Sequence, residues 1–309
     1  MSVQPTGRSG PESPERLEDL VLELAERFRA AALYYGHGTD NPEDEAWYLA
    51  LATLRLPFER DWRERNVSPA ERQAIEAMAE RRIRERLPVA YLFGEAWFCG
   101  LPFEVDRHTL IPRSPVSELI EAGFHPWIDP ERVRRVADVG TGCGCIAIAT
   151  ALAMPEVQVL ATDISAQALA VAARNVARHG VARQVRLLQG DLLDPLPAGL
   201  QLEVIVANLP YVPAEELDHL PAEYRHEPRL ALEGGGADGL DLVDRLLGQC
   251  RTRLAPDGLL VCEVGDGMDR FEARHPHLPV TWVTFENGGD GVFVVEAAVL
   301  ARSLHGAAD

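Results

Sequence analysis

Apolar residues near the start of the chain recur with the spacing of amphipathic helices. The first such face carries Leu17, Leu20, Val21, Leu24, Ala25 and Phe28. Ser13-Pro14 precedes this run as an N-cap and first-turn proline, and the same signal returns at Asn41-Pro42 and Ser68-Pro69, where Glu71 would complete a capping box. We predict a helical domain over residues 13–95, after a Gly-, Pro- and Ser-rich stretch at 1–12 that we expect to be disordered.

Beyond residue 95 the pattern changes to short apolar runs that end in turns. Residues 96–105 predict a hairpin around Gly100, within a linker over 96–111. Runs typical of buried strands follow at 136–139, 158–162, 185–189, 205–208 and 258–264, and the segments near 280–285 and 292–296 predict an antiparallel pair. This alternation indicates an α/β domain over 112–300, followed by a tail at 301–309.

Composition narrows the function classes. With 309 residues and 47% hydrophobic content, the chain can form one large core and a smaller domain. Its 30 basic and 48 acidic residues give a formal charge of −18, which opposes broad contact with nucleic-acid phosphates and would attract a basic protein. Arg81, Arg82, Arg84 and Arg86 are the local exception; they would either touch an acidic partner or form a solvated face.

The cysteines and the hydropathy pattern predict a location. Five cysteines, an odd number without a recognisable secretory leader, predict a reducing cytoplasm, and no apolar run has the length of a membrane span. Cys143 and Cys145 lack a second Cys/His pair at zinc spacing, so we expect packed thiols and no metal site.

Small and acidic residues follow the predicted strands at their ends. Gly140, Gly142 and Gly144 would let the backbone approach a ligand at a helix N-terminus, although a nicotinamide-binding motif would want Gly or Ala where Cys145 stands. Asp163 is placed like the acid that binds ribose hydroxyls, and the alternative is a plain helix cap. Asp191 follows the third strand, where its carboxylate can face an adenine amino group.

The fourth strand ends on Asn208-Leu209-Pro210-Tyr211, which suits a planar NH2 group. A nitrogen conjugated to a carbonyl group or a ring is a poor nucleophile. Hydrogen-bond acceptors for both of its N–H groups would hold it so that its lone pair points at a methyl donor. The Asn208 side-chain oxygen and the Leu209 carbonyl would accept these hydrogen bonds, and the Tyr211 ring would cover the planar face. The alternative is an Asx-type turn with Tyr211 only packed.

This order of motifs resembles the class I S-adenosylmethionine-dependent methyltransferases, in the branch whose catalytic tetrapeptide is usually Asn-Pro-Pro-Tyr. Within that branch the chain resembles the protein-glutamine N5-methyltransferases, those that act on the third protein of the large ribosomal subunit more than those that act on release factors. The resemblance covers residues 14–300, and segments 35–42, 97–100, 111–115, 224–228 and 287–293 add to it. Leu209 departs from the pattern, since the family normally has proline there.

The resemblance implies a Rossmann-like seven-stranded sheet, with the helical domain and the hairpin recognising a ribosomal-protein substrate. It implies S-adenosylmethionine as the cofactor, bound by Asp138, Gly140, Thr141, Gly142, Gly144, Asp163, Ile164, Asp191, Leu192 and Asn208. It also implies catalytic roles for Asn208, Leu209, Pro210 and Tyr211, and substrate contacts by Asn208, Leu209, Tyr211 and Glu227. Glu227 and the glycines at 234–239 look like a segment that orders over the bound glutamine. Arg113 would either steer the methionine carboxylate or pair with a nearby acid.

Three other functions fit parts of the pattern. The first is methylation of a glutamine in a release factor. The second is methylation of the N6 amine of adenine or the N4 amine of cytosine in a nucleic acid, because these amines present the same planar NH2 group. The acidic charge and the lack of an evident target-recognition domain count against a direct nucleic-acid substrate. A non-catalytic ribosome-assembly factor, in which Leu209 has blunted catalysis, is the third.

Overall fold

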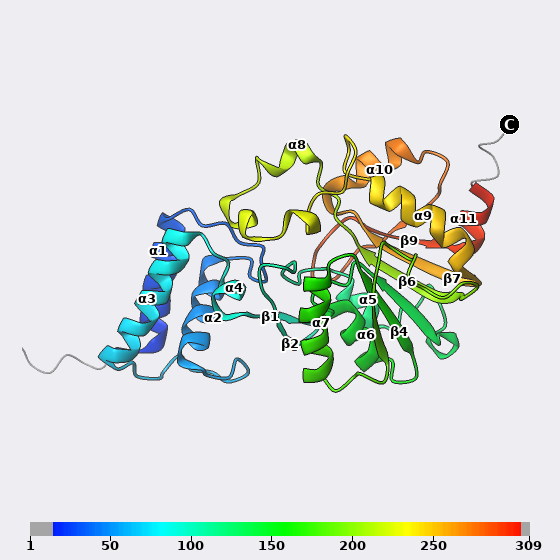
Figure 1. Cartoon of the computed structure of the whole chain (residues 1–309). Helices are drawn as coiled ribbons and strands as arrows, with labels where there is room; N and C mark the ends of the chain where they lie inside the picture. The colour runs from blue at the N-terminus through cyan, green and yellow to red at the C-terminus, as the bar shows by residue number, and fades with distance from the viewer. Residues whose placement is uncertain (1–14, 304–309) are drawn as a thin grey trace, which may run out of the picture. The chain divides into compact units, whose positions relative to one another are not determined.

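The computed structural model describes residues 15–303, which divide into two compact units (Figure 1). The chain passes from the first unit to the second between Phe93 and Gly94. The predictions for residues 1–12, for Ser13-Pro14 themselves and for tail positions 304–309 lie outside the described residues.

The first unit is helical and has its own apolar core. Its helices are α1 (Leu17–Ala30), α2 (Pro42–Leu54), α3 (Pro69–Glu85) and α4 (Val89–Phe93). The prediction that α1 begins at Pro14 is wrong. The preceding backbone pairs instead with another segment, through hydrogen bonds from Val67 N to Glu15 O (2.9 Å) and from Leu17 N to Arg65 O (2.8 Å), so these groups are satisfied outside a helix.

The other two helix starts in this unit are as predicted. The Asn41 side chain accepts from the backbone N–H of Asp44 at 2.9 Å. Ser68 and Glu71 form the full capping box, in which Ser68 Oγ accepts from Glu71 N (3.3 Å) and Glu71 Oε2 accepts from Ser68 N (3.0 Å).

The arginine run on α3 is not a uniform solvated face. Arg82 is 1% exposed, and its Nε donates to Glu45 Oε1 at 2.6 Å. Arg81 and Arg84 are exposed. This buried ion pair links α3 to α2. Removing either partner would leave the other charge buried without a counter-charge.

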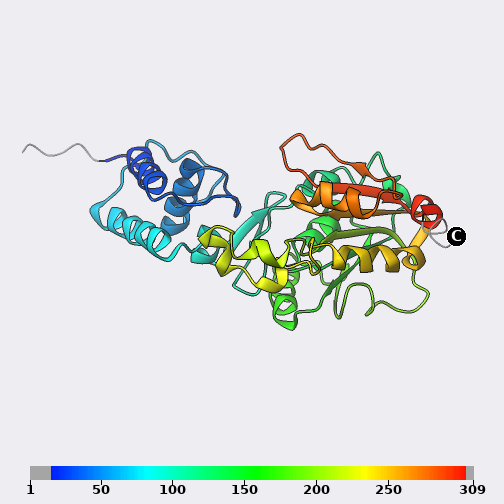
Figure 2. The same cartoon turned by 90° about the horizontal axis from the view of Figure 1, so that it is seen from above.

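A seven-stranded sheet forms the centre of the second unit, as predicted. Its strands are β3 (Arg135–Val139), β4 (Gln158–Asp163), β5 (Val185–Gln189), β6 (Leu202–Asn208), β7 (Leu254–Glu263), β8 (Thr281–Trp282) and β9 (Val292–Glu296). The order is β5-β4-β3-β6-β7-β9-β8, parallel from β5 to β7. The predicted antiparallel pair is confirmed, since β9 runs antiparallel to both β7 and β8; Figure 2 shows β9 alongside β7.

Helices cover both faces of this sheet. The helices of this unit are α5 (Ser117–Glu121), α6 (Cys145–Ala153), α7 (Ala166–Arg178), α8 (Ala214–Leu217), α9 (Asp241–Arg253), α10 (Met268–Arg274) and α11 (Ala297–Ser303), of which α6, α7, α9, α10 and α11 pack on the sheet. Alternate residues of β3, β6, β7 and β9 share one apolar cluster with α9, α10 and α11. Because side chains alternate along a strand, the intervening residues face the other layer, where α6 and α7 contact the sheet (Figure 1).

The predicted hairpin is also present, as β1 (Glu95–Phe98) and β2 (Leu101–Glu104). Its turn lies at Cys99-Gly100, where both residues have positive φ (48° and 68°), the geometry of tight hairpin turns. Within residues 15–303, no helix combines the length and the apolar character needed to cross a membrane.

Candidate active site

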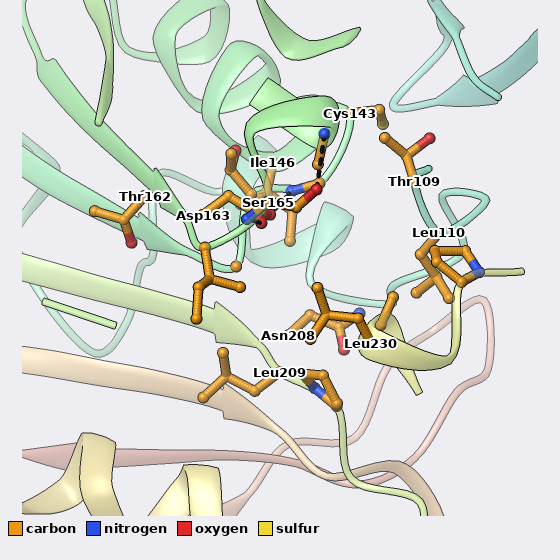
Figure 3. Close-up of a pocket in the computed structure, with 18 of the residues that line it drawn as sticks. Thr109, Leu110, Cys143, Ile146, Thr162, Asp163, Ser165, Asn208, Leu209 and Leu230 are labelled. Carbon is orange, nitrogen blue, oxygen red and sulfur yellow. Dashed lines mark hydrogen bonds between the residues drawn. The ribbon is translucent and has the colours of Figure 1, made fainter. Parts of the chain in front are cut away.

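A cavity of about 280 Å³ opens at the carboxyl ends of the parallel strands. This is where open α/β sheets bind ligands, beside the point at which the strand order reverses. In this sheet the reversal falls at β3, which has β4 on one side and β6 on the other. Figure 3 shows Asp163 and Ser165 on one wall of the pocket and Asn208 with Leu209 on another.

The glycine loop between β3 and α6 forms part of this wall. Gly140, Gly142 and Gly144 all have positive φ (75°, 56° and 85°), which side chains disfavour. A Cβ added at Gly140 would lie 3.1 Å from Cδ2 of Leu209, whereas one added at Gly142 would meet nothing within 4 Å. Gly140 therefore permits close packing, and Gly142 presents bare backbone to the cavity.

Asp138 supports the loop from beneath. Its Oδ2 accepts from Thr141 Oγ1 (2.5 Å) and from the N–H of Ala147 (3.0 Å). Its Oδ1 is buried and has no hydrogen-bond partner among residues 15–303. Burial raises the pKa of Asp138 to about 7. Asp138 was predicted to contact the cofactor, but it does not line the cavity. Thr141, which it supports, does line it.

Asp163, the last residue of β4, lines the cavity together with Ile164. Asp163 Oδ2 accepts from the N–H of Gly142 at 2.9 Å, and Oδ1 accepts from the N–H of Ser165 at 2.8 Å. The cap of α7 is Ser165, whose hydroxyl accepts from the N–H of Ala168, so the interpretation of Asp163 as a plain cap is wrong. Burial raises the pKa of Asp163.

Asp191 and Leu192 line the cavity at the end of β5. Asp191 forms an ion pair with Arg245 of α9, which also lines the cavity and which the sequence patterns did not single out. Leu192 has a positive φ of 46° and is buried.

The tetrapeptide reaches the same cavity. Asn208, Leu209 and Pro210 line it, and Tyr211 does not. Burial raises the pKa of the Tyr211 hydroxyl. Asn208 pairs with Glu263 of the neighbouring strand β7, and the side-chain donors of Asn208 and Tyr211 lower the pKa of that carboxyl, so Asn208 is not only part of a local turn.

Glycines downstream allow the chain to close around the tetrapeptide backbone. A Cβ at Gly234 would lie 2.6 Å from the carbonyl oxygen of Pro210, and one at Gly239 would lie 2.3 Å from that of Tyr211. Gly234 N also donates to Val212 O at 3.1 Å. The predicted glycine-rich segment thus packs directly on the backbone of residues 210–212.

Glu227 has a different position from the one expected of a substrate contact. It does not line the cavity; its carboxylate accepts from Arg113 through Nη1 (2.7 Å) and Nη2 (2.9 Å), and from the N–H of Ile111 at 3.0 Å. Of the two roles predicted for Arg113, the structure shows the pairing with a nearby acid, and that acid is Glu227. A fork-shaped pair of this kind fixes both segments rigidly.

Glu263, the last residue of β7, was not predicted as a site residue. It is 5% exposed, and Ser114 Oγ donates to its Oε2 at 2.5 Å. Burial raises the pKa of Glu263, while the Ser114 hydrogen bond, the charge of Arg113 and the nearby side-chain donors of Tyr211 and Asn208 oppose that rise. The sequence did carry a signal for Glu263, because a charged residue there ends the apolar run Leu259-Leu260-Val261-Cys262.

The site fits the S-adenosylmethionine that the resemblance implies. Bare backbone at Gly142 lets the amino-acid part of this cofactor approach the loop closely, and Asp138 holds that loop from beneath through Thr141 and Ala147. Asp163 offers carboxylate oxygens at the cavity wall to ribose hydroxyls. Cys143 and Cys145, also at this wall, are buried thiols; their mutual hydrogen bond and burial raise the pKa of Cys145.

Comparisons with known proteins identify the family. Residues 124–237 match the family described as "Methyltransferase small domain". The ribosomal protein uL3 glutamine methyltransferase of Bordetella pertussis is 46% identical to this chain over 91% of the chain and 95% of the relative. Those of Burkholderia pseudomallei (43%, over 94% and 98%) and Xanthomonas campestris pv. campestris (45%, over 91% and 91%) are similar throughout. This chain belongs to the family of ribosomal protein uL3 glutamine methyltransferases.

Proposed function

We propose that this enzyme transfers a methyl group to the side-chain nitrogen of a glutamine in ribosomal protein uL3. The observation that carries the proposal is the shared cavity, in which Asn208 and Leu209 lie across from Gly142 and Asp163. The substrate named for the relatives supports the choice of uL3.

S-adenosylmethionine is the methyl donor and supplies a methyl group already activated by its sulfonium. The protein must therefore orient the glutamine amide rather than deprotonate it. The Asn208 side-chain oxygen accepts one N–H of the amide and the Leu209 carbonyl accepts the other, which aims the nitrogen lone pair at the methyl. Pro210, which lines the cavity, confines the plane of the amide beside these acceptors, whereas Tyr211 lies outside the cavity lining.

The other site residues hold the donor. Asp163 binds the ribose hydroxyls, and the remaining oxygen of Asp191 faces the adenine edge, with Ile164 and Leu192 as apolar neighbours. The backbone of Gly140, Thr141, Gly142 and Gly144 holds the methionine part, with Asp138 beneath. Glu227 acts in this scheme through Arg113, by fixing the wall that Arg113 contributes.

The charge of the chain supports a protein substrate. A net charge of −18 favours approach of a basic ribosomal protein and disfavours free nucleic acid. A substrate of this class implies that the enzyme acts in the cytoplasm during ribosome biogenesis.

The test is transfer of radiolabelled methyl from S-adenosylmethionine to three purified substrates: uL3, a release factor and undermethylated DNA. We expect label in uL3 alone, lost when its target glutamine is replaced. The Asn208→Ala variant should bind the cofactor with nearly unchanged affinity and give no label. Label in the release factor or the DNA instead would overturn the substrate, and cofactor binding without label in any substrate would indicate a non-catalytic assembly factor.

A further inference from the structure

The last residue of β7 stands directly beside the catalytic loop. Glu263 pairs with Asn208 in the parallel ladder between β7 and β6, and only 5% of Glu263 is exposed. A buried carboxylate is tolerated only where hydrogen bonds compensate its lost hydration. The partners of Glu263 therefore show which groups it holds in place.

The only side-chain hydrogen bond to the Glu263 carboxylate among residues 15–303 comes from Ser114 Oγ, at 2.5 Å. Two tetrapeptide residues lie beside the same carboxylate, since Asn208 pairs with Glu263 in the ladder and the side-chain donors of Asn208 and Tyr211 lower its pKa. An ionised carboxylate offers only acceptors, so Asn208 must turn its NH2 toward Glu263. That choice leaves the Asn208 carbonyl oxygen for the cavity, which Asn208 lines and Glu263 does not.

The chain just after Glu263 makes room for the tyrosine ring. Gly265 has a φ of 52°, and a Cβ added there would lie 2.6 Å from Cε2 and 2.8 Å from the hydroxyl oxygen of Tyr211. These distances are far inside van der Waals contact, so a larger residue at 265 would displace the ring. Glu263 and Gly265 thus define the place of Tyr211 from two directions.

We propose that Glu263 is a positioning residue for methyl transfer, which fixes the orientation of the Asn208 amide and the Tyr211 hydroxyl, while Gly265 provides the space that the Tyr211 ring needs. The proposal rests on the function proposed above and deepens it. Because Glu263 acts through Asn208 and Tyr211 from behind the cavity wall, it governs the rate of transfer rather than cofactor binding.

Glu263→Gln tests this with little change in volume. Glutamine has one acceptor oxygen and an NH2 group that faces the donors, so Asn208 is no longer forced into one orientation. We expect kcat to fall by about 10- to 100-fold, as for a misplacement of order 1 Å. The KM for uL3 and the Kd for S-adenosylmethionine, measured by calorimetry, should stay within about twofold, since neither binding contact is removed. Glu296→Gln, at the exposed end of β9 in the same sheet, is the matched control and should behave as wild type.

A kcat that is unchanged in Glu263→Gln, or one that falls only in parallel with cofactor affinity and thermal midpoint, would overturn the proposal. If Glu263→Gln does not fold, the variants Gly265→Ala and Tyr211→Phe test the proposal instead. Both should lower kcat with cofactor affinity kept, and wild-type kcat in both would refute the positioning role. Wild type and Glu296→Gln must transfer methyl to uL3 in the same assay; their failure would count against the proposed function instead.

Discussion

At Leu209 the group proposed to act on the substrate and the group that packs are different parts of one residue. The backbone carbonyl is the proposed acceptor, whereas the side chain is 4% exposed and lies in the core of the second unit beside Gly140. Any residue supplies the carbonyl. The departure from the usual proline therefore changes packing and rigidity while it keeps the chemical group.

Leu209→Pro should consequently remain active. We expect kcat for uL3 methylation within about threefold of wild type, because the acceptor survives and proline restores a fixed backbone angle. Leu209→Ala keeps the same carbonyl but removes buried side-chain contacts, so it should lower the free energy of unfolding by about 2–4 kcal/mol. Steady-state kinetics and denaturant unfolding measure the two effects, and a loss of activity in Leu209→Pro as deep as that of Asn208→Ala would refute the separation.

Individual site residues were predictable from the sequence where one local run contains the whole signal. Asn208-Leu209-Pro210-Tyr211 and the glycines at 140, 142 and 144 are of this kind. The structure brings Gly140, Gly142, Asn208, Leu209 and Pro210 to one cavity, whereas Gly144 and Tyr211 do not line it. Glu263 and Arg245 were not predictable, because their partners are set by strand order and helix packing rather than by sequence spacing. The true partner of Glu227 was missed for the same reason, since Arg113 is remote from it in sequence.

At the scale of elements, one amide side chain links the hairpin to the glycine loop. Asn175 of α7 is fully buried. Its Nδ2 donates to the carbonyls of Glu104 and Cys143, each at 2.9 Å, and its Oδ1 accepts from the N–H of Glu104 at 2.8 Å. The end of β2 and the loop that lines the cavity are thus held by the same residue.

We expect Asn175→Ala to lower the free energy of unfolding by about 2–4 kcal/mol, since it leaves buried backbone groups without partners. Cofactor affinity should weaken too, because Cys143 lines the cavity. Arg174→Ala removes a neighbouring but exposed ion pair with Glu104 (2.7 Å) and should cost about 0–1 kcal/mol. Chemical denaturation of both variants measures the difference; equal costs would show that the Asn175 hydrogen bonds contribute little.

Strands β3 and β6 and the second half of β7 were predictable because each is a largely apolar run, and central parallel strands are buried on both faces. The edge strand β5 is partly exposed, and β8 has only two residues. The start of α1 was not predictable. Local capping preferences favoured Ser13-Pro14, but pairing of Arg16 with Asn66 satisfies the backbone there and delays the helix to Leu17. A contact between segments distant in sequence outweighed the local signal.

At the scale of the whole molecule, buried carboxyl groups gather at one edge of the sheet. Asp138, Asp163 and Glu263 come from β3, β4 and β7, and burial raises the pKa of each. The nearby charge of Asp163 adds to the rise at Asp138. Each of these carboxyl groups therefore binds a proton more readily than an exposed carboxyl group does.

The sign of the resulting pH dependence follows from Asp138. Its folded-state pKa, about 7, lies above its ordinary value of 3.8, so the folded protein binds a proton more readily than the unfolded chain between these values. The stabilisation is complete below the ordinary value and is lost as pH rises through about 7.

Asp138→Asn removes this titration and should therefore become relatively more stable than wild type as pH rises. Between pH of about 5 and 8, we expect the difference in unfolding free energy between variant and wild type to shift in favour of the variant, by at most about 3 kcal/mol. Denaturant unfolding of the cofactor-free protein at several pH values measures it. Asp257→Asn, which removes the same charge from an exposed ion pair with Arg132, should show no such shift. A difference for Asp138→Asn that is constant with pH would mean that the carboxyl group is ionised throughout this range and that burial does not raise its pKa.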